Sequence, residues 1–472
     1  MVSDQEGSHD VVERIQRIEV GLLPDPVLKN REPEPQPLID RMGILKTPGV
    51  SIAVIDRYQI DWARGYGVLG VGRPERVGVE TPFQAASISK PVTAMAALHL
   101  VEEGHLALDE DVNRYLASWK IPANGAWQPR VTLRHLLSHT GGLTVHGFPG
   151  YPRDDPLPTL RQVLDGEKPA NTPAIRVDIV PGLHPRYSGG GYCVLQQLLV
   201  DVTGQSVPDL MRQLVLDPLG MTQSSYEQPL PPARWRATPT GYLVGGEPVQ
   251  GQWHVYPEMA AAGLWTTPSD LARFAIEIQR GQAGRSTTVL SPTMTREMLA
   301  PQADPRQGLG INMKGAGRSL RFWHDGWNEG FNGDLVAYPE LGRGAVVLIN
   351  SNHGYRWGLV GEILRAIAYE YGWPEYLPQN RRVAPINSHI HSTYVGAYEP
   401  QQGVKWVVSD VDQTLFLQLN GQAPIQLYPK SDTMFFAQEV NIEVTFTKTE
   451  DGMVTGVRLQ QDGQQVDARK RV

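Results

Sequence analysis

Three short motifs carry side chains that together could perform serine acyl transfer. Ser87 and Lys90 form an S-x-x-K tetrad at the start of an apolar segment, and Tyr187-Ser-Gly and His324-Asp-Gly326 follow in that order. A serine hydroxyl is a poor nucleophile until a neighbouring base takes its proton. A lysine amine can be that base when desolvation lowers its pKa from about 10.4. The residue types and their order therefore predict an acyl-enzyme site.

The tetrad lies where the sequence predicts a helix. The run TPFQAASISKPVTAMAALHLVEEG reads as a strand end, a turn and an apolar helix that stops at Gly104. A spacing of three residues on a helix places Ser87 and Lys90 on one face. We expect Ser87 in the first turn, where free backbone N–H groups and the helix dipole favour an oxyanion. For the tetrad taken alone, a solvated Ser/Lys pair on an ordinary helix is the alternative.

Further segments surround the motifs in a fixed order. The run TPGVSIAVIDRYQIDWARGYG reads as a two-strand hairpin that turns near Asp56-Arg57, ahead of the serine. Downstream come the runs VTLRHLLSHTGGL, RYSGGGY, AAAGLWTTPSDLARF and FWHDGWNEGFNG. Over residues 40–370 this arrangement resembles the superfamily of serine β-lactamases and penicillin-binding proteins. More closely it resembles the class C-like branch, with its D-aminopeptidases, D-alanyl-D-alanine carboxypeptidases and family VIII esterases.

The resemblance assigns a role to each motif residue. It makes Ser87 the acylated nucleophile, Lys90 its proton partner, and Tyr187 the general base and later the general acid. A phenol with a pKa near 10 could serve only if a cation such as Lys90 stabilises its phenolate. His324 takes the position that K-T-G enzymes give to lysine, and Gly326 leaves room for the substrate backbone beside the edge strand.

The oxyanion hole implied by the resemblance consists of the backbone N–H groups of Ser87 and Trp327. Removing one such donor typically costs on the order of 10²–10³ in rate. The chain departs from the family at motif two, because Gly189 stands where Tyr-x-Asn enzymes have the asparagine that grips the acyl amide of the substrate. Only backbone is offered there, so a peptide or ester held by strand-edge backbone is expected rather than a β-lactam. His324 in place of lysine points the same way, since it attracts a carboxylate more weakly at neutral pH.

The resemblance implies a serine hydrolase that acts on short peptides or other small molecules. A peptidase or amidase of the D-aminopeptidase or carboxypeptidase type ranks above a carboxylesterase. The reason is that a small C-terminal barrel is expected over residues 391–472, and a barrel that restricts access to the active site suits a peptidase. The H-x-G motif without a motif-two asparagine favours the esterase. Acyl transfer to an acceptor other than water is a further alternative. The rival class is a scaffold or sensor that kept the fold without the activity.

Aromatic residues flank the H-x-G segment. Core packing is the expectation for Trp323 and Trp265. Trp327 and Phe331 lie on the loop side and are candidates for the walls of an apolar subsite.

Other patterns have structural explanations. Gly65-x-Gly67-x-x-Gly70 matches a dinucleotide fingerprint, but RPERVGVE follows in place of a helix, so we expect a glycine-rich β-turn. His135 and His139 have a zinc-like i, i+4 spacing but lack the glutamate of H-E-x-x-H and a third ligand. Asp325 and Glu329 could touch substrate, although acidic loop residues are usually solvated. We expect no metal and no organic cofactor.

Composition limits the partners and the compartment. The chain has 472 residues, a net charge of −7 and no basic cluster, which argues against nucleic acid and anionic membranes as partners. Cys193 is the sole cysteine, so no intrachain disulfide can form, and its apolar surroundings predict a buried helical position. No window reaches the roughly 18–20 apolar residues that span a bilayer. The N-terminal residues lack the pattern of a secretion signal, so a cytoplasmic location is expected.

The mixed α/β (α+β) chain is expected to have two folded domains. Residues 1–38 would form a helix, over 10–23, and a proline-rich linker. Residues 39–375 would form the hydrolase domain, an antiparallel sheet flanked by helices plus an all-helical lobe.

A second linker (376–390) would lead to a small barrel over 391–472. From Tyr394 on, strand-like alternation and turns such as Asn420-Gly421 predict six to eight short antiparallel strands. This region resembles the lipocalin-like domain attached to some serine peptidases of the superfamily. The resemblance implies a cap or a homo-oligomerisation module, and a barrel with its own ligand is the alternative.

Overall fold

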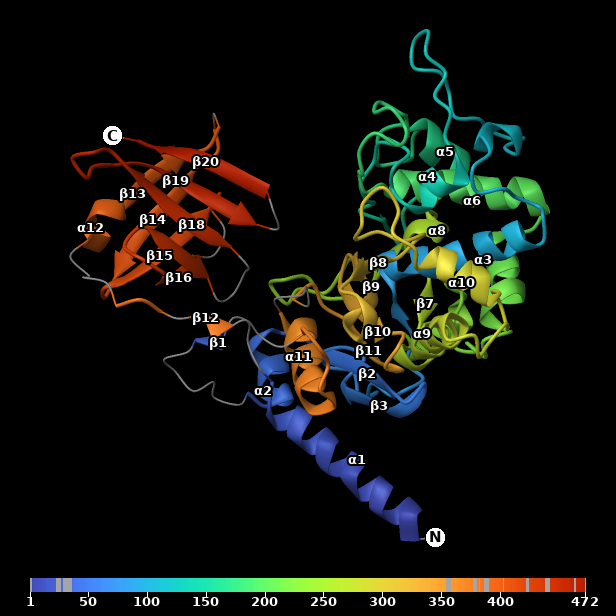
Figure 1. Cartoon of the computed structure of the whole chain (residues 1–472), viewed down its shortest axis with the longest axis horizontal. Helices are drawn as coiled ribbons and strands as arrows, with labels where there is room; N and C mark the ends of the chain where they lie inside the picture. The colour runs from blue at the N-terminus through green and yellow to red at the C-terminus, as the bar shows by residue number, and fades with distance from the viewer. Residues whose placement is uncertain are drawn as a thin grey trace. The chain divides into compact units, whose positions relative to one another are not determined.

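The computed structural model describes residues 2–22, 27–28, 36–353, 358–376, 380–381, 383–385, 390–401, 403–421, 424–437, 442–461 and 464–471. The chain divides into two compact units (Figure 1), one made of Met1–Glu19 with Leu38–Glu375 and the other of Val20–Pro37 with Tyr376–Val472. The segment Val20–Pro37 groups with the second unit, where β1 (Val27–Leu28) pairs in parallel with β12 (Asn380–Arg381). Most of the expected linker residues (23–26, 29–35, 377–379, 382 and 386–389) lie outside the described residues.

A six-stranded antiparallel sheet forms the centre of the first unit. Its strand order is β3-β2-β11-β10-β9-β8. The strands are β2 (Gly49–Asp56), β3 (Gln59–Gly67), β8 (Asn312–Lys314), β9 (Arg321–Asn328), β10 (Phe331–Tyr338) and β11 (Arg343–Ile349). The predicted hairpin is confirmed: β2 and β3 are joined by Arg57 and Tyr58, both with positive φ (52° and 63°), as a two-residue type I′ turn requires. A β-turn, not a helix, follows Gly67, so the dinucleotide pattern is a turn as expected.

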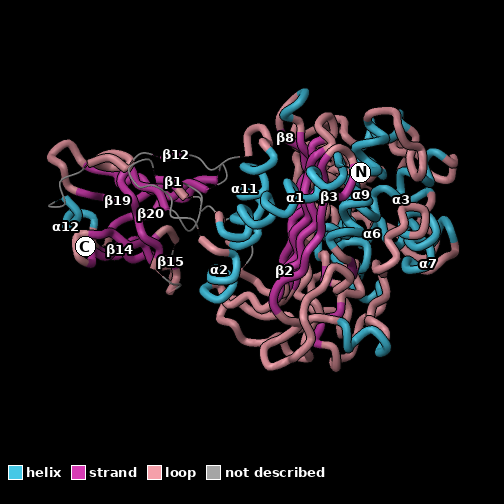
Figure 2. Tube along the Cα trace, turned by 90° about the horizontal axis from the view of Figure 1, so that it is seen from below, coloured by secondary structure: helices cyan, strands magenta, loops and turns pink. Residues whose placement is uncertain are grey.

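Helices cover both faces of this sheet, which Figure 2 shows almost edge-on. On one face lie α2 (Leu38–Ile44) and α11 (Leu359–Tyr371), while α1 (Val2–Val20) meets the edge strand β3, where Glu19 accepts from Arg64 and Tyr66. On the other lies α9 (Pro268–Gln282), with α3 (Ser89–Glu102) beyond it. The α9 helix begins as predicted, with Thr267 accepting a hydrogen bond from the Asp270 N–H and proline at the first helical position. Because the sheet is covered on both sides, every residue of β10 is buried.

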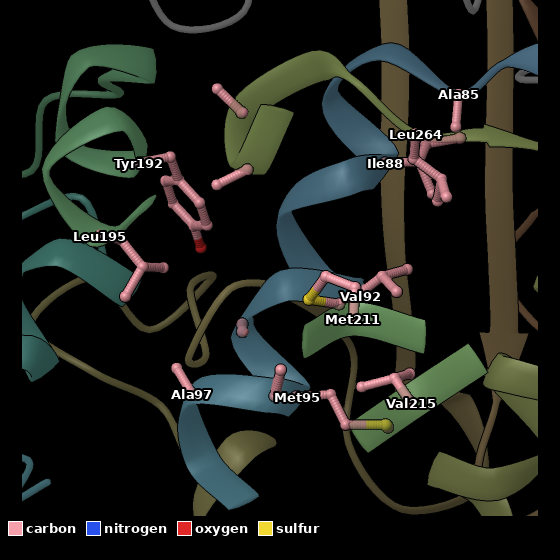
Figure 3. Close-up of a cluster of buried hydrophobic side chains, with 14 of the residues drawn as sticks. Ala85, Ile88, Val92, Met95, Ala97, Tyr192, Leu195, Met211, Val215 and Leu264 are labelled. Carbon is pink, nitrogen blue, oxygen red and sulfur yellow. The ribbon is translucent and has the colours of Figure 1, made fainter. Parts of the chain in front are cut away.

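A mainly helical lobe packs against α3. It contains α4 (Leu133–Leu137), α5 (Leu160–Asp165), α6 (Gly189–Thr203), α7 (Val207–Met211) and α8 (Met259–Ala262), with one two-residue strand pair, β5 (Tyr151–Pro152) and β6 (His254–Val255). Figure 3 shows Val92 and Met95 of α3 among Tyr192 and Leu195 of α6 and Met211 of α7. Cys193 is buried in α6, as predicted. The α3 helix therefore lies in a continuous apolar core, where any polar side chain on it is deprived of water.

The second unit contains a closed barrel of eight antiparallel strands in sequential order, which confirms the predicted small barrel. The strands are β13 (Gly396–Glu399), β14 (Trp406–Val411), β15 (Thr414–Leu419), β16 (Ile425–Pro429), β17 (Met434–Ala437), β18 (Glu443–Lys448), β19 (Val454–Gln461) and β20 (Gln464–Lys470). A helical turn, α12 (His391–Tyr394), precedes them. Inward side chains pack on one another, with Tyr394, Phe435 and Phe446 in mutual ring contact. The barrel interior thus has a packed apolar core of its own.

Within the described ranges, every helix is too short or too polar to cross a lipid bilayer.

Candidate active site

Ser87 lies in a tight turn between a short strand and the apolar helix. The 3₁₀ turn η1 (Ala86–Ile88) follows β4 (Phe83–Gln84), and the α-helix itself begins at Ser89, two residues later than the nucleophile. Ala86 has a positive φ of 50°, a conformation that costs a non-glycine residue energy and is concentrated at functional sites. The Ser89 hydroxyl holds this turn by donating to Ala86 O (2.6 Å) and accepting from the Leu264 N–H (3.0 Å). Ser87 is partly exposed, whereas its neighbours on both sides are buried.

The Lys90 ammonium group points at this serine from one turn along α3. Its Nζ lies 2.9 Å from Ser87 Oγ and 2.8 Å from the carbonyl oxygen of Ala261. Lys90 is 2% exposed, and Nζ also lies 5.0 Å from the centre of the Tyr187 ring. Burial lowers the pKa of Lys90 to about 7, although nearby Cys193 and Asp325 oppose the shift. A large fraction of the lysine is therefore neutral at neutral pH, as a base for Ser87 must be.

The H-x-G strand packs directly against the serine turn. A Cβ atom on Gly326 would lie 2.2 Å from the carbonyl oxygen of Ala85, so only glycine lets η1 approach β9 this closely. In the described part of the sheet, β8 pairs with β9 at Arg321, Phe322 and Trp323 and leaves the stretch His324–Trp327 without a strand partner on that side. Trp327 is 46% exposed at this edge. The nucleophile and an open strand edge are thus brought side by side.

Three histidines surround the Tyr187 ring. Ring centres lie 4.3 Å away for His139, 4.9 Å for His146 and 6.4 Å for His324. His139 follows α4 with a positive φ of 57°, and its Nδ1 accepts a hydrogen bond from the Ser188 N–H (3.2 Å). Burial lowers the pKa of His139 well below its usual value, and the nearby Lys90 adds to this, which favours the neutral ring that accepts from the Ser188 N–H. His324 is buried, and its Nδ1 lies 2.7 Å from Asp325 O, which fixes the proton on Nδ1 because a carbonyl only accepts.

The structure corrects two of the predicted substrate-binding residues. Phe331 is fully buried at the start of β10, with its ring edge-to-face on Phe83 (6.5 Å) and Trp265 (5.8 Å), so it offers a substrate no surface. Gly189 lies at the start of α6, and its backbone N–H is already used. The N–H groups of all three glycines bond within the protein: Gly189 to His146 O (2.9 Å), Gly190 to Val145 O (3.0 Å) and Gly191 to Ser188 Oγ (2.9 Å).

Other candidate residues have defined places. Trp265 is in the core, as predicted, whereas Trp323 is half-buried on β9. Asp325 is half-buried near Lys90, and the Glu329 N–H donates to the Tyr256 hydroxyl (2.9 Å).

The histidine pair on and after α4 has structural roles. The His135 ring accepts from the Thr132 N–H (3.3 Å) and so caps α4. Among the described residues no cluster of three or more His, Cys, Asp or Glu side chains is placed to hold a metal ion.

Sequence reasoning missed His146. It lies in the loop after the H-T-G-G-L turn, outside the motifs and at no spacing that indicates a function. Its contact with Tyr187 is made by the tertiary structure.

Comparison with known proteins agrees with this architecture. Residues 38–369 match the model of the β-lactamase family, and residues 380–470 match a domain of unknown function, DUF3471. Penicillin-binding protein 4* of Bacillus subtilis is 25% identical over 86% of this chain and 90% of its own length. Protein flp of Staphylococcus aureus (strain N315) is 27% identical over 65% of this chain but 60% of its own length.

Solved structures establish the same fold. The octameric penicillin-binding protein homologue from Pyrococcus abyssi superposes with a TM-score of 0.60 at 22% identity, covering 91% of this chain and 98% of that one. A β-lactamase/D-alanine carboxypeptidase from Yersinia pestis gives a TM-score of 0.53 at 20% identity, covering 71% of this chain and 97% of that one.

Proposed function

The chain belongs to the β-lactamase family, whose members are typically serine hydrolases, and we propose that it hydrolyses its substrate through an acyl-enzyme on Ser87. The observation that carries this proposal is the contact of 2.9 Å between Lys90 Nζ and Ser87 Oγ. A buried amine of lowered pKa beside a partly exposed hydroxyl has the geometry and basicity that serine activation requires.

The proposed acylation uses residues from both sides of the site. Ser87 Oγ attacks the substrate carbonyl carbon as its proton passes to neutral Lys90, and the carbonyl oxygen becomes the oxyanion. Close packing of η1 on β9 supports an oxyanion hole made by the N–H groups of Ser87 and Trp327. The Tyr187 hydroxyl would then protonate the leaving group, which departs as the acyl-enzyme forms, and the proton held by Lys90 would pass to the Tyr187 oxygen. Water would release the acyl group and restore the serine proton.

We further propose that the substrate is a short peptide or related amide, of the D-aminopeptidase or carboxypeptidase type. The edge of β9 from His324 to Trp327 supports this, because an extended peptide can add to a strand edge through backbone hydrogen bonds. Exposed Trp327 would contact an apolar substrate group there.

A carboxylesterase is the second candidate. It is favoured by the lack of any backbone donor at Gly189 for the acyl amide of a peptide. An ester has no such amide, so it loses nothing at this position. Acyl transfer to another acceptor would use the same acyl-enzyme, and the features that favour the esterase also disfavour a β-lactam substrate.

The proposal is tested by intact mass after incubation with a fluorophosphonate probe. We expect one adduct on the wild type that maps to Ser87 and is absent in Ser87→Ala. Ser409→Ala, a barrel serine, serves as the matched control and should be labelled like the wild type. A folded wild type without an adduct would favour the scaffold alternative. D-aminoacyl anilides assayed against short-chain esters would then separate the peptidase from the esterase.

A homo-oligomer through the barrel, a cytoplasmic location and the absence of nucleic-acid, membrane and cofactor partners stay predictions. Size-exclusion chromatography with light scattering of the full chain and of a barrel-deleted chain would test the first.

A further inference from the structure

The loop that carries His146 is tied to the start of α6 by a ladder of hydrogen bonds. Ser188 Oγ donates to Thr144 O (2.8 Å), and the N–H groups of Gly190 and Gly189 bond the next two carbonyls, of Val145 and His146. Val145 has a positive φ of 65°, which turns the chain at this point. The backbone of His146 is therefore fixed beside the residue that follows Tyr187-Ser in motif two.

The side chain of His146, in contrast, is free to meet a substrate. The residue is exposed, and its ring lies 4.9 Å from the Tyr187 ring. Buried His139 contacts the same ring at 4.3 Å. Within the described part of the chain, neither imidazole nitrogen of His146 has a hydrogen-bond partner. An imidazole with unused nitrogens beside the proposed proton carrier is available as a donor or an acceptor.

The loop also fills the space that a side chain at position 189 would need. A Cβ atom on Gly189 would lie 2.9 Å from Phe148 Cε2 and 3.1 Å from His146 O. An asparagine at this position would therefore collide with the loop. The motif-two amide of the resembling enzymes and the loop 144–148 of this chain exclude each other, and the loop brings His146 with it.

We propose that His146 is a substrate-contacting residue that binds the acyl amide of the substrate, in place of a motif-two asparagine. The inference rests on the proposed acyl-enzyme function and deepens it, because it gives the site a polar contact for N-acylated amino acids and peptides. One imidazole N–H donates to the amide carbonyl oxygen that an asparagine amide would otherwise bind. Selectivity for an acyl amide is then set by a loop residue outside the three motifs.

Two esters that differ only at the acyl amide test this. In the p-nitrophenyl ester of N-acetylglycine, an amide N–H and C=O take the places of two methylenes of p-nitrophenyl pentanoate. The ratio of their kcat/KM values cancels changes in the reactivity of Ser87. We expect the wild type to prefer the N-acetylglycyl ester after correction for the intrinsic hydrolysis rates. His146→Phe keeps a ring beside Tyr187 but no donor, and should reduce the ratio about tenfold, the upper range for one neutral hydrogen bond.

Two further variants make the result specific. His146→Asn restores a donor and should recover part of the ratio, whereas His105→Ala, an exposed histidine beyond the C-terminal end of α3, should leave it unchanged. A ratio that is the same in the wild type and His146→Phe, while the fluorophosphonate still labels Ser87 in both, would overturn the inference and leave the proposed function standing. Absence of labelling in the wild type would instead overturn the proposed function, and this inference with it.

Discussion

The half of the site that carries Ser87 is built from the core of the first unit, whereas the half that carries Tyr187 is built from loops. In the serine half (η1, the start of α3 and the H-x-G stretch of β9), Lys90 is held in a helix whose residues Ser89 to Leu98 are all buried. In the tyrosine half (residues 139–148 and 183–189), backbone hydrogen bonds and residues with positive φ hold the rings in place. Core packing is stiff and sensitive to a single methyl group, while loops adapt.

Mutations in the two halves are therefore expected to differ in whether they change stability as well as activity. A side chain in the serine half belongs to the core and to the chemistry at once, so its removal changes both the free energy of unfolding and the rate. A side chain in the tyrosine half contributes mostly to the rate.

The largest expected effect is a loss of acylation rate, and we expect it from one variant in each half. Lys90→Met removes the amine that contacts Ser87, and Tyr187→Phe removes a hydroxyl while keeping the ring between the histidines. Each removes a proposed proton carrier, and we expect each to lower the acylation rate by about 10²–10⁴-fold. Stopped-flow measurement of acyl-enzyme formation with an activated ester checks this. A Tyr187→Phe variant that acylates like the wild type would show that the tyrosine half binds substrate without moving protons.

The free energy of unfolding should distinguish Lys90→Met from Tyr187→Phe. Folded Lys90 gains its proton only below about pH 7, whereas an unfolded lysine keeps one up to about 10.4. Between these values the unfolded state carries more protons, so this group makes the wild type less stable as the pH falls from 10 to 7. Lys90→Met removes the burial cost and should raise the free energy of unfolding at pH 7 by on the order of a few kcal/mol. The gain should shrink towards pH 10.

Urea unfolding at pH 7 and at pH 9.5 measures this gain. Tyr187→Phe is the matched control, because it leaves no buried charge and should differ from the wild type by less than about 0.5 kcal/mol at both pH values. Equal stability of Lys90→Met and the wild type at pH 7 would mean that Lys90 is less desolvated than its burial indicates.

Two glycine-to-alanine variants compare the packing of the two halves. The methyl group of Gly326→Ala would meet the Ala85 carbonyl at 2.2 Å and must push the serine turn away from β9. A displacement of about 1 Å can cost on the order of 10² in rate, and we expect that loss together with lower stability. Gly189→Ala meets the edge of the Phe148 ring at 2.9 Å and the His146 carbonyl oxygen at 3.1 Å, and both contacts are less severe than the one at Gly326. We expect a loss of about tenfold or less for it.

Steady-state rates and thermal unfolding of the two variants decide this comparison. Equal losses would mean that the loop 144–148 is as rigid as the core.

Each part of the serine half could be predicted from the sequence, because each part is a short local pattern, and the resemblance implied that the H-x-G stretch meets the tetrad. The tetrad spans one helical turn, and the hairpin turn at Arg57 and Tyr58 lies between two runs rich in β-branched and aromatic residues. The barrel strands were likewise predictable from alternation and turns. The position of Phe331 was not, because a strand covered on both faces buries every residue and alternation then carries no information.

The tyrosine half was predictable only in part. Tyr187 was found through its motif, but His146 is 41 residues earlier in the chain and in no pattern. The bonding of Gly189 depends on the same loop, so its use in hydrogen bonds within the protein could not be seen either. Contacts between distant loops depend on tertiary structure, which residue spacing does not encode.

The smallest expected effect is a change in kcat/KM of about tenfold per pH unit on the acid side of the pH profile. Its response to mutation shows which half of the site controls that side. Protonated Lys90 cannot accept the Ser87 proton, so kcat/KM should fall as the pH drops below about 7, the value to which burial lowers the pKa of this lysine. Cys193, Asp325 and the rings of Tyr187 and Tyr192 face its ammonium group. If this acid limb of the pH profile is set by the serine half, the residual activity of Tyr187→Phe should show the same limb, and so should the activity of His146→Asn. A limb that disappears with His146→Asn would instead assign the titration to the tyrosine half, and the division of labour between core and loops would be the reverse of the one proposed.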